Sequence, residues 1–149
     1  MARPVNVSVS RVIRCPRDRL AAFAADPANA PAWYANIESV EWQGPPSTEP
    51  GARAAFVARF MGQRLAYTYE IREHVPGRRL AMSTAEGPFP METVYEWEDA
   101  GEGRTRMTLT NRGRPEGFKA VLAPLMALAM RRAMTNDLAA LARVVKRRS

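Results

Sequence analysis

The sequence has few of the residues on which most metal sites and covalent active sites depend. It contains one cysteine, Cys15, and one histidine, His74, in 149 residues. A single cysteine cannot form an internal disulfide, and one cysteine with one histidine cannot supply the usual ligands of a zinc site. The chain also lacks a glycine-rich phosphate loop and the serine turn of hydrolases. We therefore expect no metal ion and no cofactor, and we interpret Cys15 as a small buried side chain.

Long hydrophobic runs are also missing. The longest apolar stretch, Phe118 to Met130, is interrupted by Lys119 and Pro124. Its length of 13 residues falls short of the ~20 that span a bilayer. The residues after Met1 contain no apolar core of a signal peptide. These features predict a cytoplasmic protein.

Acidic residues are scarce in one part of the chain only. The formal net charge is +7, yet residues 1–111 carry 13 basic and 13 acidic side chains, whereas residues 112–149 carry nine basic and two acidic ones. No aromatic residue is interleaved among the basic residues of the predicted helix, which are Arg131, Arg132, Arg143, Lys146, Arg147 and Arg148. The segment matches no zinc-finger, RNA-recognition or basic-zipper pattern. A solvated basic helix face explains the excess better than a nucleic-acid site, so we expect no nucleic-acid partner.

Alternating apolar and polar residues predict a meander of strands. In 64–72, for example, arginine and glutamate occupy one phase, and leucine, tyrosine and isoleucine occupy the other. One face of the sheet is therefore expected to be wet and the other covered. The outer phase also holds Glu92, Glu96 and Glu98, which we interpret as solvated residues and not as paired catalytic carboxylates. The predicted strands cover 5–14, 39–43, 53–60, 64–72, 91–98 and 104–112, with glycine-bearing hairpin turns at 61–63, 75–77 and 100–103.

Two short helices are predicted after the first strand, and one long helix closes the chain. Pro16 opens the first short helix, and the second, which contains Trp33, follows the start signal Asp26-Pro27. After Pro115 the apolar period becomes 3.6 and continues to about Arg147, with a kink expected at Pro124. Strands followed by a long helix predict an α+β fold, in which a curved antiparallel sheet of six to seven strands wraps around the C-terminal helix.

Two apolar stripes run along the predicted long helix. The first narrows from leucine to alanine toward the helix start, which should leave space opposite the sheet; its residues are Met134, Leu138, Leu141 and Val145, then Met130, Ala127, Ala123 and Ala120. The second lies on another face and could dock on an anionic membrane or on a second copy of the chain. It consists of Phe118, Leu122, Leu125 and Met126.

Several local features together resemble one known family. They are Trp33 in the second short helix, the stretch Glu73 to Leu80, the segment Gly87 to Pro90 before a strand, and the closing stretch Asp137 to Leu141. With this order of elements, the chain resembles the START-like (SRPBCC) superfamily, most closely its bacterial polyketide cyclase/dehydrase-like branch. The resemblance covers nearly the whole chain and implies a single domain over 1–149, with a helix-grip fold around a ligand cavity. Its motifs are turns and core positions, so they are specific for the fold and weak for the chemistry.

The inward phase of the predicted strands combines large aromatic residues with a few neutral polar ones. Pockets for small apolar ligands use this mixture, because apolar walls exclude water and a few hydrogen-bonding groups orient the ligand. An ordinary filled core is the alternative, and the small residues of the helix together with the resemblance favour a cavity. The predicted ligand-binding residues are Trp33, Phe56, Phe60, Tyr67, Tyr69, Thr93, Tyr95, Met107, Asn111, Ala127, Met130 and Met134.

The sequence thus leaves three functions open. The first is binding or carriage of a hydrophobic small molecule, lipid-like or polyketide-like. The second is an enzyme that cyclises or dehydrates a poly-ketone, in which Tyr67, Tyr69 or Tyr95 donates a hydrogen bond to an enolate. No arginine or histidine falls on the inward phase, which weakens the enzyme hypothesis. The third is docking, as a homodimer or on a membrane, through the second stripe.

Overall fold

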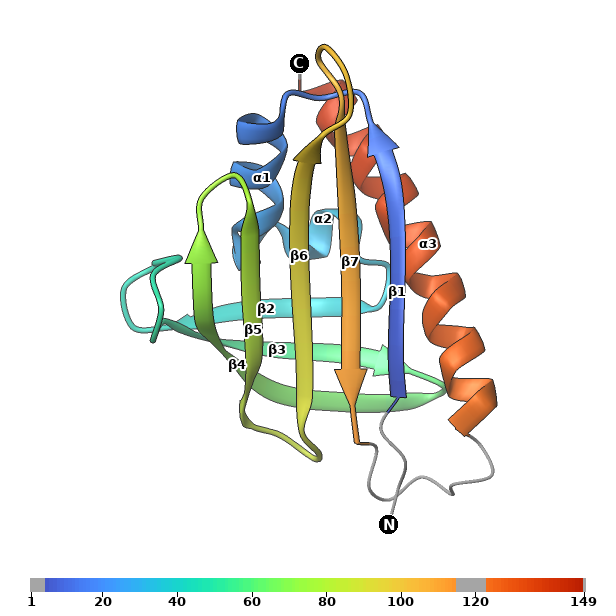
Figure 1. Ribbon diagram of the computed structural model, residues 1–149. Helices are drawn as coiled ribbons and strands as arrows, with labels where there is room; N and C mark the ends of the chain where they lie inside the picture. The colour runs from blue at the N-terminus through green and yellow to red at the C-terminus, as the bar shows by residue number, and fades with distance from the viewer. Residues whose placement is uncertain (1–4, 115–122, 149) are drawn as a thin grey trace.

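A seven-stranded antiparallel sheet bends around a long C-terminal helix in the computed structural model of the chain, which describes residues 5–114 and 123–148 (Figure 1). The spatial order of the strands is β1-β7-β6-β5-β4-β3-β2. This arrangement confirms the predicted α+β fold, with two short α-helices after the first strand. The elements are β1 (Val5–Ile13), α1 (Arg17–Ala25), the 3-10 helix η1 (Pro27–Asn29), α2 (Ala30–Trp33), β2 (Ile37–Gln43), β3 (Arg53–Phe60), β4 (Gln63–Val75), β5 (Arg79–Glu86), β6 (Met91–Asp99), β7 (Thr105–Gly113) and α3 (Ala123–Arg147).

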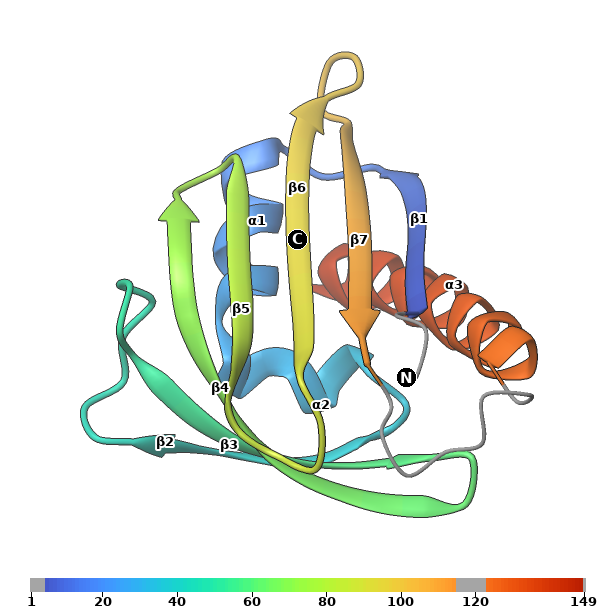
Figure 2. The same ribbon diagram turned by 60° about the horizontal axis from the view of Figure 1, so that its bottom comes forward.

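The strand β4 forms the corner of the sheet. Its pairing with β5 is irregular at two places, between Thr68 and Tyr69 and between Ile71 and Glu73. Such irregularities bend a strand and increase its twist. The strands β2 and β3 therefore run across the direction of the upright strands β5, β6, β7 and β1 (Figure 1), and Figure 2 shows them at the lower end of these strands. The bend creates a concave face, against which α3 lies.

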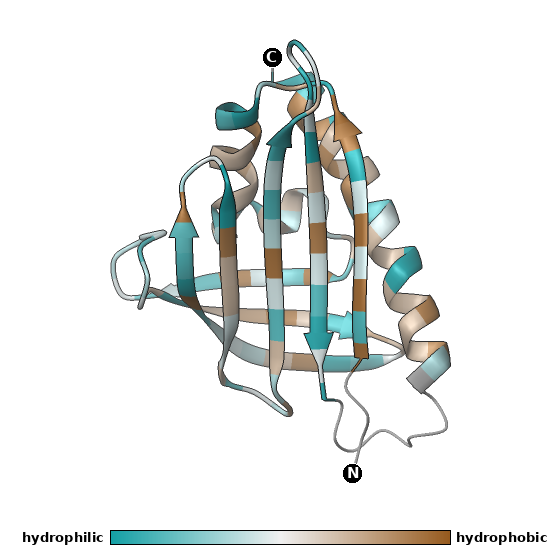
Figure 3. Ribbon diagram, viewed as in Figure 1, coloured by the Kyte–Doolittle hydropathy of each residue, from teal (hydrophilic) through white to brown (hydrophobic). Residues whose placement is uncertain are grey.

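The two faces of the sheet differ in polarity as predicted. Bands of hydrophilic and hydrophobic colour alternate along β6 and β7 (Figure 3). On the outer face each of the three glutamates of β6 pairs with an arginine of a neighbouring strand: Glu92 with Arg112, Glu96 with Arg79, and Glu98 with Arg106. The interpretation of these glutamates as an outer, solvent-facing row is confirmed.

The strand β5 is the one strand of the described sheet for which the sequence analysis predicted no segment. It follows the predicted turn at 75–77 and pairs with β4 and β6. Its sequence, RLAMSTAE, has no clear alternation, and Ala81 and Met82, which are adjacent and therefore point to opposite faces, are both buried. A strand buried on both faces carries no period-2 signal.

The second half of α3 packs against the sheet and the short helices in the main hydrophobic core, at what we call the closed end of the fold. Met134, Leu138, Leu141 and Val145 are all buried in the main hydrophobic core, as the first apolar stripe predicted. The predicted start of the helix, including Phe118, Ala120 and Leu122, lies outside the described residues. Pro124 is the second described residue of α3, next to residues that are not described, so the kink predicted there stays a prediction.

The apolar surface of α3 differs from the predicted docking stripe. Met126 is only 4% exposed, because it lies one helical turn from Met130 and shares its inward face. Leu125 is exposed, and so is Leu128, which the stripe did not include. A docking role for Leu125 stays a prediction. None of the helices within 5–114 and 123–148 has the length and apolar character needed to cross a bilayer.

Candidate functional site

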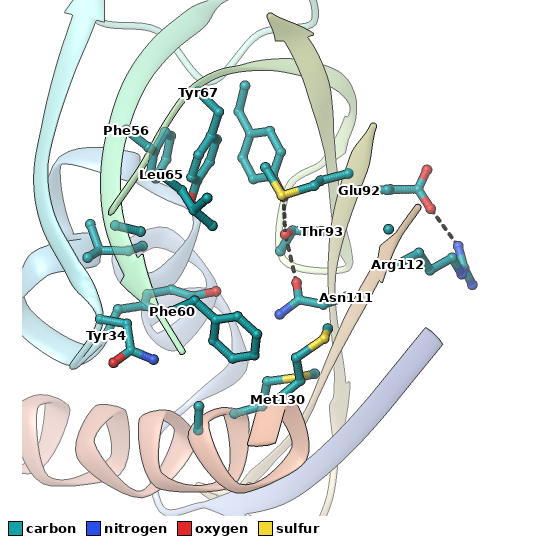
Figure 4. Close-up of a pocket in the computed structure, with 18 of the residues that line it drawn as sticks. Tyr34, Phe56, Phe60, Leu65, Tyr67, Glu92, Thr93, Asn111, Arg112 and Met130 are labelled. Carbon is teal, nitrogen blue, oxygen red and sulfur yellow. Dashed lines mark hydrogen bonds and ion pairs between the residues drawn. The ribbon is translucent and has the colours of Figure 1, made fainter. Parts of the chain in front are cut away.

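A cavity of about 160 Å³ lies between the concave face of the sheet and the first half of α3. Side chains of β3, β4, β6, β7 and α3 line it (Figure 4). Its inner limit is visible in the register of β6 with β7. The pair Thr93 and Asn111 lines the cavity, whereas the pair Trp97 and Met107 is buried in the solid core. The space therefore occupies one end of the fold, where α3 presents methionine and alanine in place of leucine.

Most of the predicted ligand-binding residues line this cavity, and three do not. Those that line it are Phe56, Phe60, Tyr67, Tyr69, Thr93, Tyr95, Asn111, Met130 and Met134. As ligand contacts they stay predictions. Trp33, Met107 and Ala127 are not part of the lining.

The structure explains why each of the other three residues does not reach the cavity. Trp33 is buried behind the cavity wall, with its ring 4.2 Å from that of Tyr34 and 5.7 Å from that of Tyr95, measured between centroids. Met107 is fully buried on β7, deeper in the core than Asn111. Ala127 packs against the core cluster, and Ala133 is the alanine of α3 that lines the cavity.

Besides the charged residues at its opening, three lining residues carry polar groups that sequence reasoning did not assign to the site: Tyr34, Asn36 and Asp137. Tyr34 follows α2, in a connection without periodicity, so no pattern could place it. The position of Asp137 could have been noticed in the sequence. It lies between Met134 and Leu138 on the apolar stripe of α3, where a carboxylate is unexpected because ionised side chains are rarely buried.

Aromatic and methionine side chains form the walls. The rings of Phe56 and Tyr67 stack, with centroids 5.4 Å apart and an angle of 7° between their planes, and Tyr69 meets both of them edge-on. Five of the eight methionines of the chain complete the lining: Met82, Met91, Met126, Met130 and Met134. The flat wall suits a planar apolar ligand, and the unbranched methionines can adapt to its outline.

A chain of hydrogen bonds crosses one wall of the cavity. The Thr93 hydroxyl donates to Asn111 Oδ1 at 2.7 Å, so the Tyr69 hydroxyl, 2.8 Å away, donates to Thr93 Oγ1. Burial raises the pKa of Tyr69 to about 12, which keeps this hydroxyl protonated. The chain ends at the Asn111 side-chain amide, whose N–H groups have no acceptor among the described residues. Figure 4 shows Asn111 beside the cavity space, opposite Tyr34.

The cavity holds a second polar group, made of Tyr34, Tyr95 and Asp137. The hydroxyls of Tyr34 and Tyr95 are 2.7 Å apart. Burial raises the pKa of both, and the nearby carboxylate of Asp137 contributes in the same direction. These hydroxyls therefore stay protonated at neutral pH and can donate to an oxygen of a ligand, but they cannot act as bases.

Asp137 is the one buried carboxylate of the described residues. It is 3% exposed, and its Oδ1 accepts a hydrogen bond from the backbone N–H of Ala35 at 3.1 Å. Burial raises the pKa of Asp137 from 3.8 to about 6, with the hydrogen bond from Ala35 opposing the shift. At neutral pH this carboxyl is mostly ionised at an energetic cost.

This cost predicts the effect of Asp137→Asn on stability. Because the pKa of Asp137 is higher in the folded chain than in the unfolded chain, protonation of Asp137 stabilises the folded chain. This stabilisation is fully present below about pH 4 and is lost as the pH rises through about 6. The amide keeps an acceptor for Ala35 and carries no charge. We expect D137N to be more stable than the parent chain by roughly 3 kcal/mol at pH 8, with the difference vanishing toward pH 4.

Chemical denaturation at several pH values measures this difference. Glu102→Gln, an exposed acid in the turn between β6 and β7, is the matched control and should leave stability unchanged to within about 0.5 kcal/mol. A D137N difference that stays constant between about pH 4 and 8 would contradict the argument.

The other charged residues of the cavity border it only where it reaches the surface. Arg59 pairs with Glu38, and Arg112 pairs with Glu92 at 2.6 Å. Figure 4 shows the Glu92 and Arg112 side chains directed away from the cavity. No metal-binding cluster of histidine, cysteine, aspartate or glutamate occurs in the described residues. Cys15 is buried, and burial raises the pKa of its thiol, in line with its interpretation as a structural side chain.

Comparison with known proteins identifies a family with which the chain shares its sequence pattern. Residues 4–146 match the family described as polyketide cyclase/dehydrase and lipid transport. No curated protein sequence matches the chain significantly.

Solved structures share the fold over almost its full length. The protein TTHA0849 from Thermus thermophilus has a TM-score of 0.83 and 25% identity, over 97% of this chain and 99% of the other. The Zhui aromatase/cyclase from a Streptomyces species has a TM-score of 0.81 and 19% identity, over 98% and 96%. A START superfamily protein from Mycobacterium smegmatis has a TM-score of 0.76 and 14% identity, over 97% and 99%. At such low identities the last two likenesses establish a common fold and nothing about chemistry.

Proposed function

Because the chain belongs to the polyketide cyclase/dehydrase and lipid transport family, we propose that it binds one apolar, planar small molecule in the cavity under α3. The ligand is aromatic or polyketide-like and lies against the stacked rings of Phe56 and Tyr67. The activities named for the family, polyketide cyclisation, dehydration and lipid transport, all act on largely apolar molecules.

The observation that carries this proposal is the contrast between the two ends of α3. The same sheet and the same helix pack solidly around Leu138 and Leu141 and leave about 160 Å³ of space around Met130 and Ala133. Unfilled apolar space costs stability in proportion to its volume. A protein that retains such space and gives it hydrogen-bonding groups is built to hold a ligand.

The polar groups indicate how the ligand is oriented. The amide of Asn111 ends a chain of donors and has N–H groups without an acceptor in the described part of the chain, so it suits a carbonyl oxygen of the ligand. The remaining contacts of the wall are apolar and provide affinity through burial. The second function predicted from the sequence, an enzyme acting on a poly-ketone, stays a prediction.

Titration with Prodan, a neutral naphthalene ketone whose fluorescence reports the polarity around it, tests the proposal. We expect a saturable blue shift with one molecule bound per chain, and a rise in melting temperature that grows with Prodan concentration. A fluorescence change that does not saturate, with an unchanged melting temperature, would contradict the proposed function.

A further inference from the structure

One carboxylate oxygen at the cavity has no hydrogen-bond partner among the described residues. Asp137 is only 3% exposed, and of its two carboxylate oxygens only Oδ1 is engaged, by the N–H of Ala35. The second oxygen, Oδ2, has no donor among the described residues and keeps some accessible surface, since it is not among the fully enclosed polar atoms without a partner. Because Asp137 lines the cavity, this accessible surface is the part of the carboxylate that a ligand in the cavity could reach.

No cation of the described chain compensates this carboxylate. The basic side chains at the cavity, Arg59 and Arg112, lie at the surface and pair with Glu38 and Glu92. The hydroxyls of Tyr34 and Tyr95 form a hydrogen bond with each other, and neither donates to Asp137. A buried acceptor without a donor costs free energy, and a carboxylate costs more than a neutral group.

The protein does not need a carboxylate here for folding. The hydrogen bond from Ala35 requires one acceptor oxygen, which an asparagine would supply equally well and without a charge. The feature that asparagine cannot reproduce is a second acceptor oxygen directed into the cavity. This difference points to a ligand group that donates a hydrogen bond.

We propose that Asp137 Oδ2 is the specificity-determining acceptor of the cavity and selects aromatic ligands that carry a hydroxyl donor over ligands of the same shape that lack one. This inference rests on the proposed function, because it names the chemical class of the ligand that the same cavity binds. The hydroxyl of the ligand lies at the Tyr34 side of the cavity, and its aromatic body lies along the wall of Phe56 and Tyr67.

Two probes of nearly equal shape test this selection. The first, 2-naphthol, has a hydroxyl donor; the second, 2-methoxynaphthalene, has a methyl ether in its place and is more hydrophobic. Both are measured by displacement of Prodan at about pH 7.5, where the Asp137 carboxyl is ionised. We expect the parent chain to bind 2-naphthol about tenfold more tightly, since hydrogen bonds to charged groups are strong.

Asp137→Asn should remove this preference, because the amide keeps the oxygen that bonds to Ala35 and turns an N–H donor toward the cavity. We expect D137N to bind the two probes equally to within about twofold, with Prodan still bound. Thr93→Val, which alters the hydrogen-bond chain of Tyr69 and Asn111 and not the Asp137 carboxylate, is the matched control. It should alter the affinity for Prodan and leave the 2-naphthol preference of the parent chain intact.

The outcomes separate this inference from the proposed function. Equal binding of the two probes by the parent chain, or an undiminished preference in a folded D137N, would overturn the role of Asp137 while Prodan still binds. Absence of binding by Prodan and by both probes would instead overturn the proposed function itself.

Discussion

Replacing Ala133 by tryptophan is expected to abolish Prodan binding while the chain stays folded. Ala133 lies on α3 in the cavity lining, beside Met130 and Met134, so a larger side chain at this position points into the open space. An indole ring is comparable in size to the cavity of about 160 Å³. We expect the dissociation constant for Prodan to rise at least about thirtyfold, which corresponds to about 2 kcal/mol.

The tryptophan side chain should also affect the thermal stability of the free chain, because it fills empty space. New apolar contacts in a cavity offset the strain of a larger side chain, so we expect the melting temperature of the free A133W chain to be maintained or raised. Ala22→Trp, at an exposed position of helix α1, is the matched control and should bind Prodan as the parent chain does. Unchanged Prodan affinity in A133W would place the ligand elsewhere and contradict the proposed site.

The second large effect concerns the closed end of α3. Leu141→Ala should lower the free energy of unfolding by about 3–5 kcal/mol, because Leu141 is fully buried in the main core. In a chain of 149 residues this loss corresponds to a fall in melting temperature of about 10 °C. Chemical and thermal denaturation followed by circular dichroism measure both quantities.

The same helix supplies the control for this prediction. Leu128 is 59% exposed, so Leu128→Ala removes the same atoms from the surface and should change stability by no more than about 0.5 kcal/mol. If the two variants were equally stable, the packing of α3 against the sheet would not be the interaction that holds this end of the fold. The contrast therefore tests the helix orientation directly.

Much of the fold could be predicted because its signals are local. In β3, β4, β6 and β7, the charged phase and the apolar phase of each strand are separated in the sequence, so their faces follow from the period of two. The glycine-bearing turns mark the hairpins; Met61 and Gly62, for instance, both have the positive φ angles that a two-residue hairpin loop requires. The strand β5 was not predicted, because residues on both of its faces are buried and its sequence therefore does not alternate.

The candidate site was predicted less completely because it depends on which half of each element faces the space. Asn111 and Met107 share one phase of β7, yet only Asn111 lines the cavity. The period of the strand cannot distinguish them, because the difference arises from which distant side chains pack against each residue. Trp33 and Tyr34 are adjacent, and the turn after α2 determines which of the two rings reaches the cavity.

The sequence by itself determined the class of fold, the inward faces of the strands and the core stripe of the terminal helix, since each of these follows from a repeat of two or 3.6 residues within one segment. Only the tertiary structure decided where the interior stays open, that Met126 and Ala133 face this opening, and that Asp137 meets the N–H of Ala35 from 102 residues away along the chain. The physical reason is that a cavity is a mismatch between surfaces of distant segments. Its position depends on the bend of β4 and the placement of α3 across the sheet, and no local periodicity encodes either of them.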